Sequence, residues 1–344
     1  PLITFVQFIL TALFTSPNFF SISAGPRSLF LNPRAIPLRS WMMYTAYFVT
    51  INLLNNWAFA YKISVPLHII VRSGGPVASM VVGYLFNARR YSWGQIMSVF
   101  LLTLGVVGAA MADAEARGQS INVESADSSA MVTTIVGFSI LALAMVLSAF
   151  QGIFADRLYE KYGRDHWKEA LFYSHTLSLP LFIATYPQLL NQWEIMVSSP
   201  PLLSKLPDIA SLKSGGQAFT SPNSISESIT GLVSSTITAI HQYEPFQSVL
   251  AGISTQVAYL LINALTQFLC IRGVHLLSAK TSSLTVTIVL NIRKLVSLLL
   301  SIYLFGNQLA PGVLFGAALV FAGGGLYGFE GARLREKSIT LKKD

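Results

Sequence analysis

The chain has 344 residues, of which 53% are hydrophobic and only 11% are charged. A soluble domain carries about 25% charged residues, so this composition excludes an ordinary soluble protein. The net charge of +8 does not indicate nucleic-acid binding, because the basic residues lie between apolar runs, where membrane topology accounts for them. The single cysteine, Cys270, excludes an internal disulfide.

The apolar residues fall into stretches of about 20, the length that an α-helix needs to cross a bilayer. In lipid every backbone polar group needs a partner within the structure, so these stretches predict helices, and the alternating segments of a β-barrel are not evident. The expected fold class is an all-α polytopic membrane protein. Its expected spans are 2–22, 41–61, 65–87, 93–112, 131–154, 170–187, 248–271, 281–304 and 310–329.

Loops rich in Lys and Arg indicate the cytosolic side of a membrane protein. The alternate loops, 113–130 and 188–247, are poor in bases, which places them in the lumen, and 188–247 reads as a mobile loop. We therefore expect one transmembrane domain over 1–330 and a cytosolic basic tail over 331–344. The basic clusters are Arg27, Arg34 and Arg39; Arg89 and Arg90; Arg157, Lys161, Arg164 and Lys168; and Arg333, Arg335, Lys337, Lys342 and Lys343.

The segment 71–113 is similar to the segment 291–330. Each has cations early in a helix, then an aromatic-polar turn and a Gly-rich final helix, and the predicted topology gives the two segments opposite directions. Such an inverted repeat is the architecture of many secondary transporters, which bind substrate near the midplane. We expect a first repeat over about 1–113 and a second over about 131–330. The second contains one more span, so we expect a ten-helix fold whose first helix is missing from this chain.

Arg293 and Lys294 lie in the middle of the apolar run 283–305, where each cation costs roughly 2.5–3.5 kcal/mol. Arg72 is their counterpart in the first repeat. Three cations from two related helices would suit the phosphates of an anionic solute. Snorkelling to a headgroup, or pairing with a backbone carbonyl, is the alternative. Residues 73–76 (Ser-Gly-Gly-Pro) would either unwind the helix beside Arg72 or pack closely, and the glycines 323–325 predict close packing.

Other polar side chains within the spans are candidates to bind the base or the sugar of such a solute. The alternative for each is a hydrogen bond between helices. No catalytic motif and no Cys/His metal cluster is present in the sequence, so we expect neither an enzyme nor a cofactor. The candidates are Asn55, Asn56, Tyr173, His175 and Gln267.

Several of these segments resemble a known family. The run 281–307 (TSSLTVTIVLNIRKLVSLLLSIYLFGN) is similar to the signature helix of nucleotide-sugar transporters of the UAA type, in the drug/metabolite transporter superfamily. The runs 159–182 and 63–80 resemble the branch that carries UDP-N-acetylglucosamine, or UDP-xylose in animals. The resemblance covers about 3–330, apart from 113–130 and 190–245.

The resemblance implies an antiporter of the Golgi or endoplasmic reticulum membrane that exchanges a UDP-sugar for UMP. Related GDP-sugar transporters read the base with an aromatic-Tyr-Asn-Asn motif, which corresponds here to Phe172-Tyr173-Ser174-His175. The resemblance therefore assigns base reading to Tyr173, and it matches Lys294 to a lysine motif of the ninth helix, although this chain reads Asn-Ile-Arg-Lys there.

Alternatives remain open at this point. An ATP/ADP exchanger of the reticulum would need the same phosphate clamp, and a membrane-embedded lipid-modifying enzyme would hold a lipid phosphate. A receptor or scaffold would not transport at all. The sequence does not choose among UDP-N-acetylglucosamine, UDP-xylose and UDP-galactose, and it leaves a homodimer open.

Overall fold

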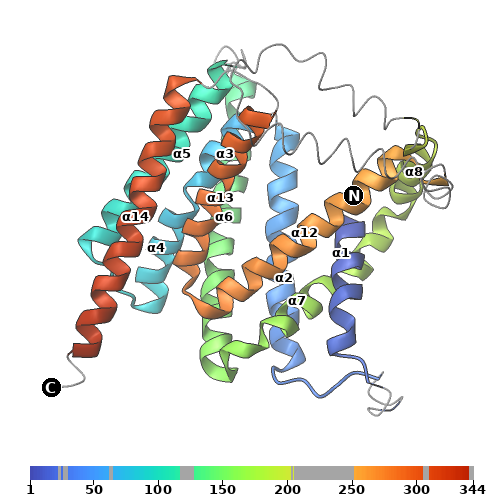
Figure 1. Cartoon of the computed structure of the whole chain (residues 1–344), viewed down its shortest axis with the longest axis horizontal. Helices are drawn as coiled ribbons and strands as arrows, with labels where there is room; N and C mark the ends of the chain where they lie inside the picture. Colours follow the sequence, from blue (N-terminus) through green and yellow to red (C-terminus); the bar gives the residue numbers. More distant parts are fainter. Residues whose placement is uncertain are drawn as a thin grey trace, which may run out of the picture. The chain divides into compact units, whose positions relative to one another are not determined.

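The computed structural model describes residues 1–21, 25, 30–61, 65–116, 128–202, 204, 252–304 and 310–340. These residues form helices, with no β-strand among them (Figure 1). Short 3-10 helices cover Ser16–Asn18, Ala58–Tyr61, Arg164–His166 and Leu179–Thr185. The α-helices are α1 (Leu2–Thr15), α2 (Leu38–Trp57), α3 (Val65–Ser73), α4 (Gly75–Asn87), α5 (Trp93–Ala116), α6 (Ser128–Tyr162), α7 (Trp167–Thr176), α8 (Tyr186–Val197), α12 (Thr255–Lys280), α13 (Ser283–Leu304) and α14 (Pro311–Thr340).

Within the described ranges, six helical segments are long and apolar enough to cross a membrane, so the chain is an all-α polytopic membrane protein. α1 and the turn after it, Leu2–Asn18, are apolar but shorter. α2 has 20 residues but carries the amides of Asn52, Asn55 and Asn56. The total of ten helices stays a prediction. The six segments are His68–Asn87, Trp93–Glu115, Ile135–Tyr162, Thr255–Lys280, Ser283–Leu300 and Pro311–Glu336.

The prediction of one continuous span over 170–187 is wrong. α7 ends at Thr176, a 3-10 helix follows, and α8 starts only at Tyr186. Pro180 lies in the first turn of the 3-10 helix, and Pro187 lies in the first turn of α8. Proline has no backbone N–H to continue the preceding helix but fits a first turn, so the two prolines divide the segment. α8 continues into the predicted loop 188–247, most of which lies outside the described residues.

One compact unit comprises residues 1–32 and 175–273, with α1, α8 and the first part of α12. Its core joins Leu2, Leu189 and Leu260, one from each of these helices. A polar contact supports the same packing of α1 on α12: Gln7 Nε2 donates a hydrogen bond of 2.7 Å to Asn263 Oδ1.

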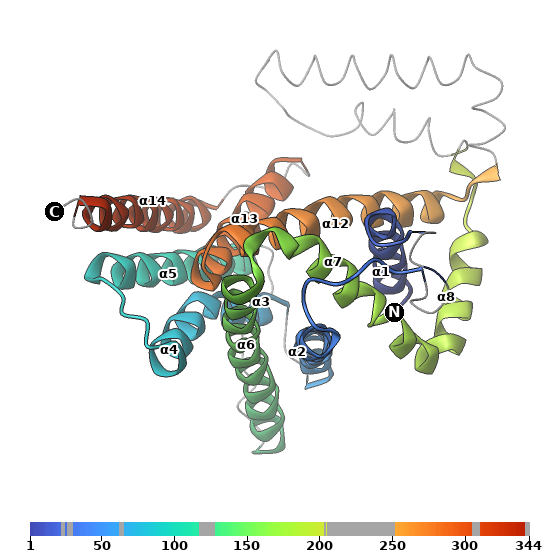
Figure 2. The ribbon, with the colours of Figure 1, turned by 90° about the horizontal axis from the view of Figure 1, so that it is seen from below.

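The other compact unit comprises residues 33–174 and 274–344, and α5 and α14 lie side by side in it (Figures 1 and 2). Glycines permit this close packing. A Cβ atom on Gly316 would lie 2.6 Å from the carbonyl oxygen of Gly105, and one on Gly323 would lie 2.9 Å from the carbonyl oxygen of Ser98. Small residues let helix backbones approach closely in membranes. The packing role predicted for Gly323 is therefore confirmed.

α5 and α14 run antiparallel. Gly94, at the start of α5, lies against Glu330, towards the end of α14, and Ala112 lies against Gly312 near the opposite ends of the two helices. α5 and α14 are the final helices of the two predicted repeat units, and a two-fold axis in the membrane plane relates equivalent helices in opposite directions. The antiparallel pair is thus the arrangement that an inverted repeat requires. α4, α5, α13 and α14 share one hydrophobic core, which includes Met80, Leu102, Ile288 and Val320.

Candidate functional site

The predicted span 65–87 is broken in the middle. α3 ends at Ser73 and α4 begins at Gly75, with Pro76 in its first turn. Because Pro76 has no backbone N–H, it cannot donate to the carbonyl of Arg72, as a helical residue at this position would. The carbonyl of the next residue, Ser73, accepts a hydrogen bond of 3.0 Å from the side-chain amide of Asn291. Of the two alternatives for residues 73–76, the structure shows an interruption of the helix, confined to Gly74.

Asn291 connects this break to α13. Its side chain is buried, its Nδ2 donates to Ser73, and its Oδ1 accepts a hydrogen bond of 3.1 Å from Lys294 Nζ. Lys294 follows Asn291 by three residues, which places both on one face of α13. Asn291 is not among the site residues predicted from the sequence, because the sequence does not show which groups its amide contacts.

A cavity of about 200 Å³ lies at this junction. It is lined by α2, α3, α4, α6 and α13, all within the compact unit of residues 33–174 and 274–344. Three lining residues are cations, five are neutral polar residues and the rest are apolar or glycine. They are Arg72, Arg293 and Lys294; Asn55, Ser79, Ser148, Thr287 and Asn291; and Ile51, Gly75, Pro76, Ala144, Met145 and Leu290.

The charged residues of this lining are all positive: among the residues that the structure describes, no Asp or Glu belongs to it. A cation at membrane depth is costly unless a water-filled cavity or an anion compensates it. Ser79 adds an unsatisfied group: its side chain is 4% exposed, and its Oγ finds no hydrogen-bond partner within the described part of the chain. The arrangement suits an anion that also accepts hydrogen bonds.

The structure brings four of the predicted site residues together in this cavity: Asn55, Arg72, Arg293 and Lys294. Asn56 follows Asn55 on α2 but is exposed and does not belong to the lining. This difference follows from helical geometry, since consecutive residues point about 100° apart.

The other predicted residues lie elsewhere. Tyr173 on α7 is buried, and its ring stacks against Trp41 with 6.4 Å between the ring centroids. It does not line the cavity. His175 and Gln267 belong to the compact unit of residues 1–32 and 175–273, where His175 contacts Phe8 and Gln267 is exposed on α12. The roles predicted for these residues stay predictions.

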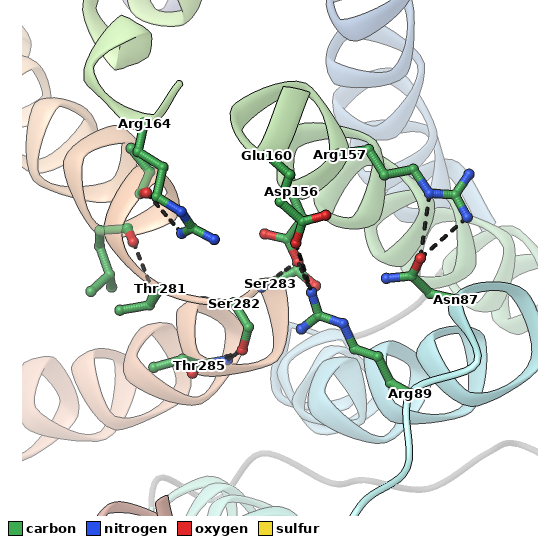
Figure 3. A network of polar contacts seen from close by, with 12 residues as sticks. Asn87, Arg89, Asp156, Arg157, Glu160, Arg164, Thr281, Ser282, Ser283 and Thr285 are labelled. Atoms are coloured by element: carbon green, nitrogen blue, oxygen red, sulfur yellow. Dashed lines mark hydrogen bonds and ion pairs between the residues drawn. The ribbon is translucent and has the colours of Figure 1, made fainter. Parts of the chain in front are cut away.

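A polar network in the compact unit of residues 33–174 and 274–344 joins two of the predicted basic clusters (Figure 3). Arg89, in the turn after α4, forms an ion pair of 3.2 Å with Asp156 of α6. The same carboxylate oxygen accepts a hydrogen bond of 3.1 Å from the backbone N–H of Ser283, the first residue of α13. Arg157 donates to the carbonyl of Phe86 over 3.0 Å. These contacts tie α4, α6 and α13 together.

Figure 1 also shows the C-terminal end of α6 near the turn between α4 and α5, in agreement with the contacts of Arg89 with Asp156 and Glu160. The partition of the basic loops between the two sides of the membrane stays a prediction. Asp156 itself was not selected from the sequence, because a single acid near the end of an apolar helix has no distinguishing pattern.

The family model described as the UAA transporter family matches residues 1–330. A UDP-N-acetylglucosamine transporter of Schizosaccharomyces pombe is 37% identical over 343 residues, which cover 100% of this chain and 90% of that protein. One of Saccharomyces cerevisiae is 33% identical, with 95% and 84% covered. A protein of Danio rerio named UDP-xylose and UDP-N-acetylglucosamine transporter is 32% identical, with the same shares covered. The chain therefore belongs to the UAA transporter family and is a transporter, not an enzyme.

Proposed function

We propose that this protein is a nucleotide-sugar antiporter that exchanges cytosolic UDP-N-acetylglucosamine for lumenal UMP across the Golgi or endoplasmic reticulum membrane, with its C-terminus in the cytosol. The names of the relatives support the substrate class. The Danio rerio relative favours UDP-xylose as a second substrate. A single chain holds the whole cavity, so the proposal does not depend on a homodimer.

The observation that carries the proposal is the acid-free cavity with Arg72, Arg293 and Lys294 in its lining. Both solutes of the exchange are phosphorylated anions, so either one would compensate these cations. The guanidinium groups of Arg72 and Arg293 would bind phosphate oxygens in bidentate fashion, while the ammonium of Lys294 would act as a compact charge. Ser79 and Asn55 would supply hydrogen bonds to the phosphate or sugar.

The same charges favour exchange over one-way transport. A carrier that reorients must close its cavity on both sides, and a closed, dry cavity that gathers three cations has a high free energy. A bound phosphate lowers this free energy, because it pairs with the cations. The loaded carrier would therefore reorient faster than the empty one, which is the kinetic condition for antiport.

In this proposal the network around Asp156 closes the cytosolic end of the carrier. The turn after α4 belongs to the first predicted repeat, whereas α6 and α13 belong to the second. Alternating access moves the repeats against each other, so opening towards the cytosol would break the ion pair between Arg89 and Asp156. Base reading stays assigned to Tyr173, with His175, Asn56 and Gln267 as further candidates.

Ligand-dependent thermal unfolding of the purified protein tests the substrate assignment. A ligand that binds only the folded state stabilises it by about 2.7 kcal/mol at one hundred times its dissociation constant. We expect UMP, UDP-N-acetylglucosamine and UDP-xylose to raise the unfolding temperature and ADP to leave it nearly unchanged. A rise with ADP that equals or exceeds the rise with UMP would refute the proposal in favour of an adenine-nucleotide exchanger.

A further inference from the structure

The side chain of Asn291 lies between Lys294 and the end of α3, which carries Arg72, in the proposed phosphate site. Its Oδ1 accepts from Lys294 Nζ over 3.1 Å, and its Nδ2 donates to the Ser73 carbonyl over 3.0 Å. Ser73 ends α3, directly after Arg72. One amide thus contacts the lysine of α13 and the opened helix that carries the arginine.

Only one orientation of this amide is compatible with both neighbours. An ammonium group donates hydrogen bonds and accepts none, whereas a backbone carbonyl accepts and cannot donate. The reversed amide would place its NH₂ group against the ammonium and its oxygen against the carbonyl, and both contacts would be repulsive. The two neighbours therefore fix the amide, and the fixed amide in turn holds the ammonium.

We infer that Asn291 is a positioning residue for the phosphate site: it holds the ammonium of Lys294 towards the cavity and fixes the α3–α4 break beside Arg72. The inference rests on the proposed function. A lysine side chain has a flexible four-carbon stem, so its charge stays in one place only when a partner holds it. Asn291 provides this partner without providing a negative charge.

The neutral charge of Asn291 is essential to the inference. Aspartate has nearly the same shape, but its carboxylate would pair with Lys294 and would present an oxygen to the oxygen of Ser73. Lys294 would then be neutralised by the protein itself and would attract a phosphate less strongly. An asparagine at this position holds the lysine and leaves its charge available to a ligand.

The test is a double-mutant cycle of Asn291 with Lys294, with UMP binding as the readout. UMP affinity is measured from the dependence of the unfolding temperature on UMP concentration, for Asn291→Asp, Lys294→Met and the double variant. We expect Asn291→Asp alone to weaken UMP binding at least about tenfold. In the Lys294→Met background the same substitution should cost clearly less affinity, because the part of its effect that acts through the lysine is absent there.

A second variant covers the case in which Asn291→Asp does not fold. Asn291→Leu removes both hydrogen bonds at similar volume, and it should weaken UMP binding more strongly when Lys294 is present than in the Lys294→Met background. Asn191→Asp makes the same chemical change on an exposed position of α8 and should leave UMP affinity unchanged.

The outcomes separate this inference from the proposed function. Equal losses of affinity from Asn291→Asp in both backgrounds would show that Asn291 acts independently of Lys294, and they would overturn the inference. An unchanged affinity in the wild-type background would overturn it as well. If Lys294→Met alone binds UMP as tightly as the wild type, the proposed phosphate site itself is wrong.

Discussion

Arg89 and Asp156 form an ion pair in which the arginine Nη2 lies 3.2 Å from Oδ2 of a carboxylate whose side chain is only 3% exposed. The same Oδ2 accepts the N–H of Ser283, at the N-terminus of α13, where a negative charge is favourable. α13 carries Lys294, so one buried carboxylate connects a predicted basic loop to the helix of the cationic cavity. Figure 3 shows that Arg89 reaches it from the turn after α4.

Asp156→Asn should make the cavity more accessible from the cytosolic side. The substitution keeps the size of the side chain but removes the buried charge that holds Arg89, and it leaves Arg89 only the more distant, exposed Glu160 as an acidic partner. The measurement uses a cysteine at Ser148, which lines the cavity, in a Cys270→Ser background. A membrane-impermeant thiol reagent, added from the cytosolic side, should label this cysteine severalfold faster in the Asp156→Asn variant.

Glu160 supplies the matched control for this prediction. It also faces Arg89, at 3.7 Å, but its side chain is 54% exposed. An exposed pair contributes about 0–1 kcal/mol, so Glu160→Gln should change the labelling rate little. Equal rates in the Asp156→Asn variant and the wild type would show that the network does not close this end.

Arg72→Gln should weaken UMP binding about tenfold or more, because a hydrogen bond to a charged group contributes about 1.5–3 kcal/mol. The stability of the ligand-free protein should stay the same or increase, since the substitution removes a cation from a cavity lined by three. Binding and unfolding are measured on the same purified samples. A loss of stability without a loss of affinity would assign Arg72 a structural role instead.

Ser79→Ala should separate binding from stability in the same way. Among the described residues the hydroxyl of Ser79 has no hydrogen-bond partner, and a buried unsatisfied group costs about 1–3 kcal/mol. Removing it should leave the unfolding temperature unchanged or raise it. It should also weaken the binding of UDP-N-acetylglucosamine, because in the proposed site this hydroxyl forms a hydrogen bond with the ligand. Unchanged binding would exclude Ser79 from the contacts.

Gly316→Ala should destabilise the protein by about 1–3 kcal/mol, the usual cost of overpacking. The added Cβ would lie 2.6 Å from backbone atoms of α5, which cannot move aside as a flexible side chain can. Gly325→Ala on the same helix is the control, because nothing lies within 4 Å of its Cβ position. Thermal unfolding in detergent should show a loss only for Gly316→Ala, and equal effects of the two substitutions would contradict the described packing.

Helical spans and the cationic site could be predicted from the sequence because each rests on a one-dimensional signal. Apolar length predicted the helices, and the cost of a charge in lipid selected Arg293 and Lys294. The internal similarity then selected Arg72, and the cavity contains all three cations. The Ser-Gly-Gly-Pro run offered a helix break as one of two alternatives, because proline and glycine interrupt helices by their local geometry, and the structure has the break at Gly74.

The remaining features depend on contacts that have no signal in a linear pattern. Asn291 is one asparagine among many until its amide is seen between Lys294 and the Ser73 carbonyl. Tyr173 is a candidate both as a polar side chain within a predicted span and through the family motif, but neither pattern reveals that its ring stacks against Trp41. Asp156 likewise gains its role from Arg89 and Ser283, which are distant in the sequence.

The central claim, that the cations of this cavity bind the phosphates of an exchanged nucleotide sugar, is tested most directly by counterflow in proteoliposomes. Labelled UDP-N-acetylglucosamine should accumulate in liposomes preloaded with UMP and much less in empty ones. Lys294→Ala should abolish this accumulation although the purified variant unfolds at the temperature of the ligand-free wild type. UMP-driven exchange at the wild-type rate in the Lys294→Ala variant would contradict the claim.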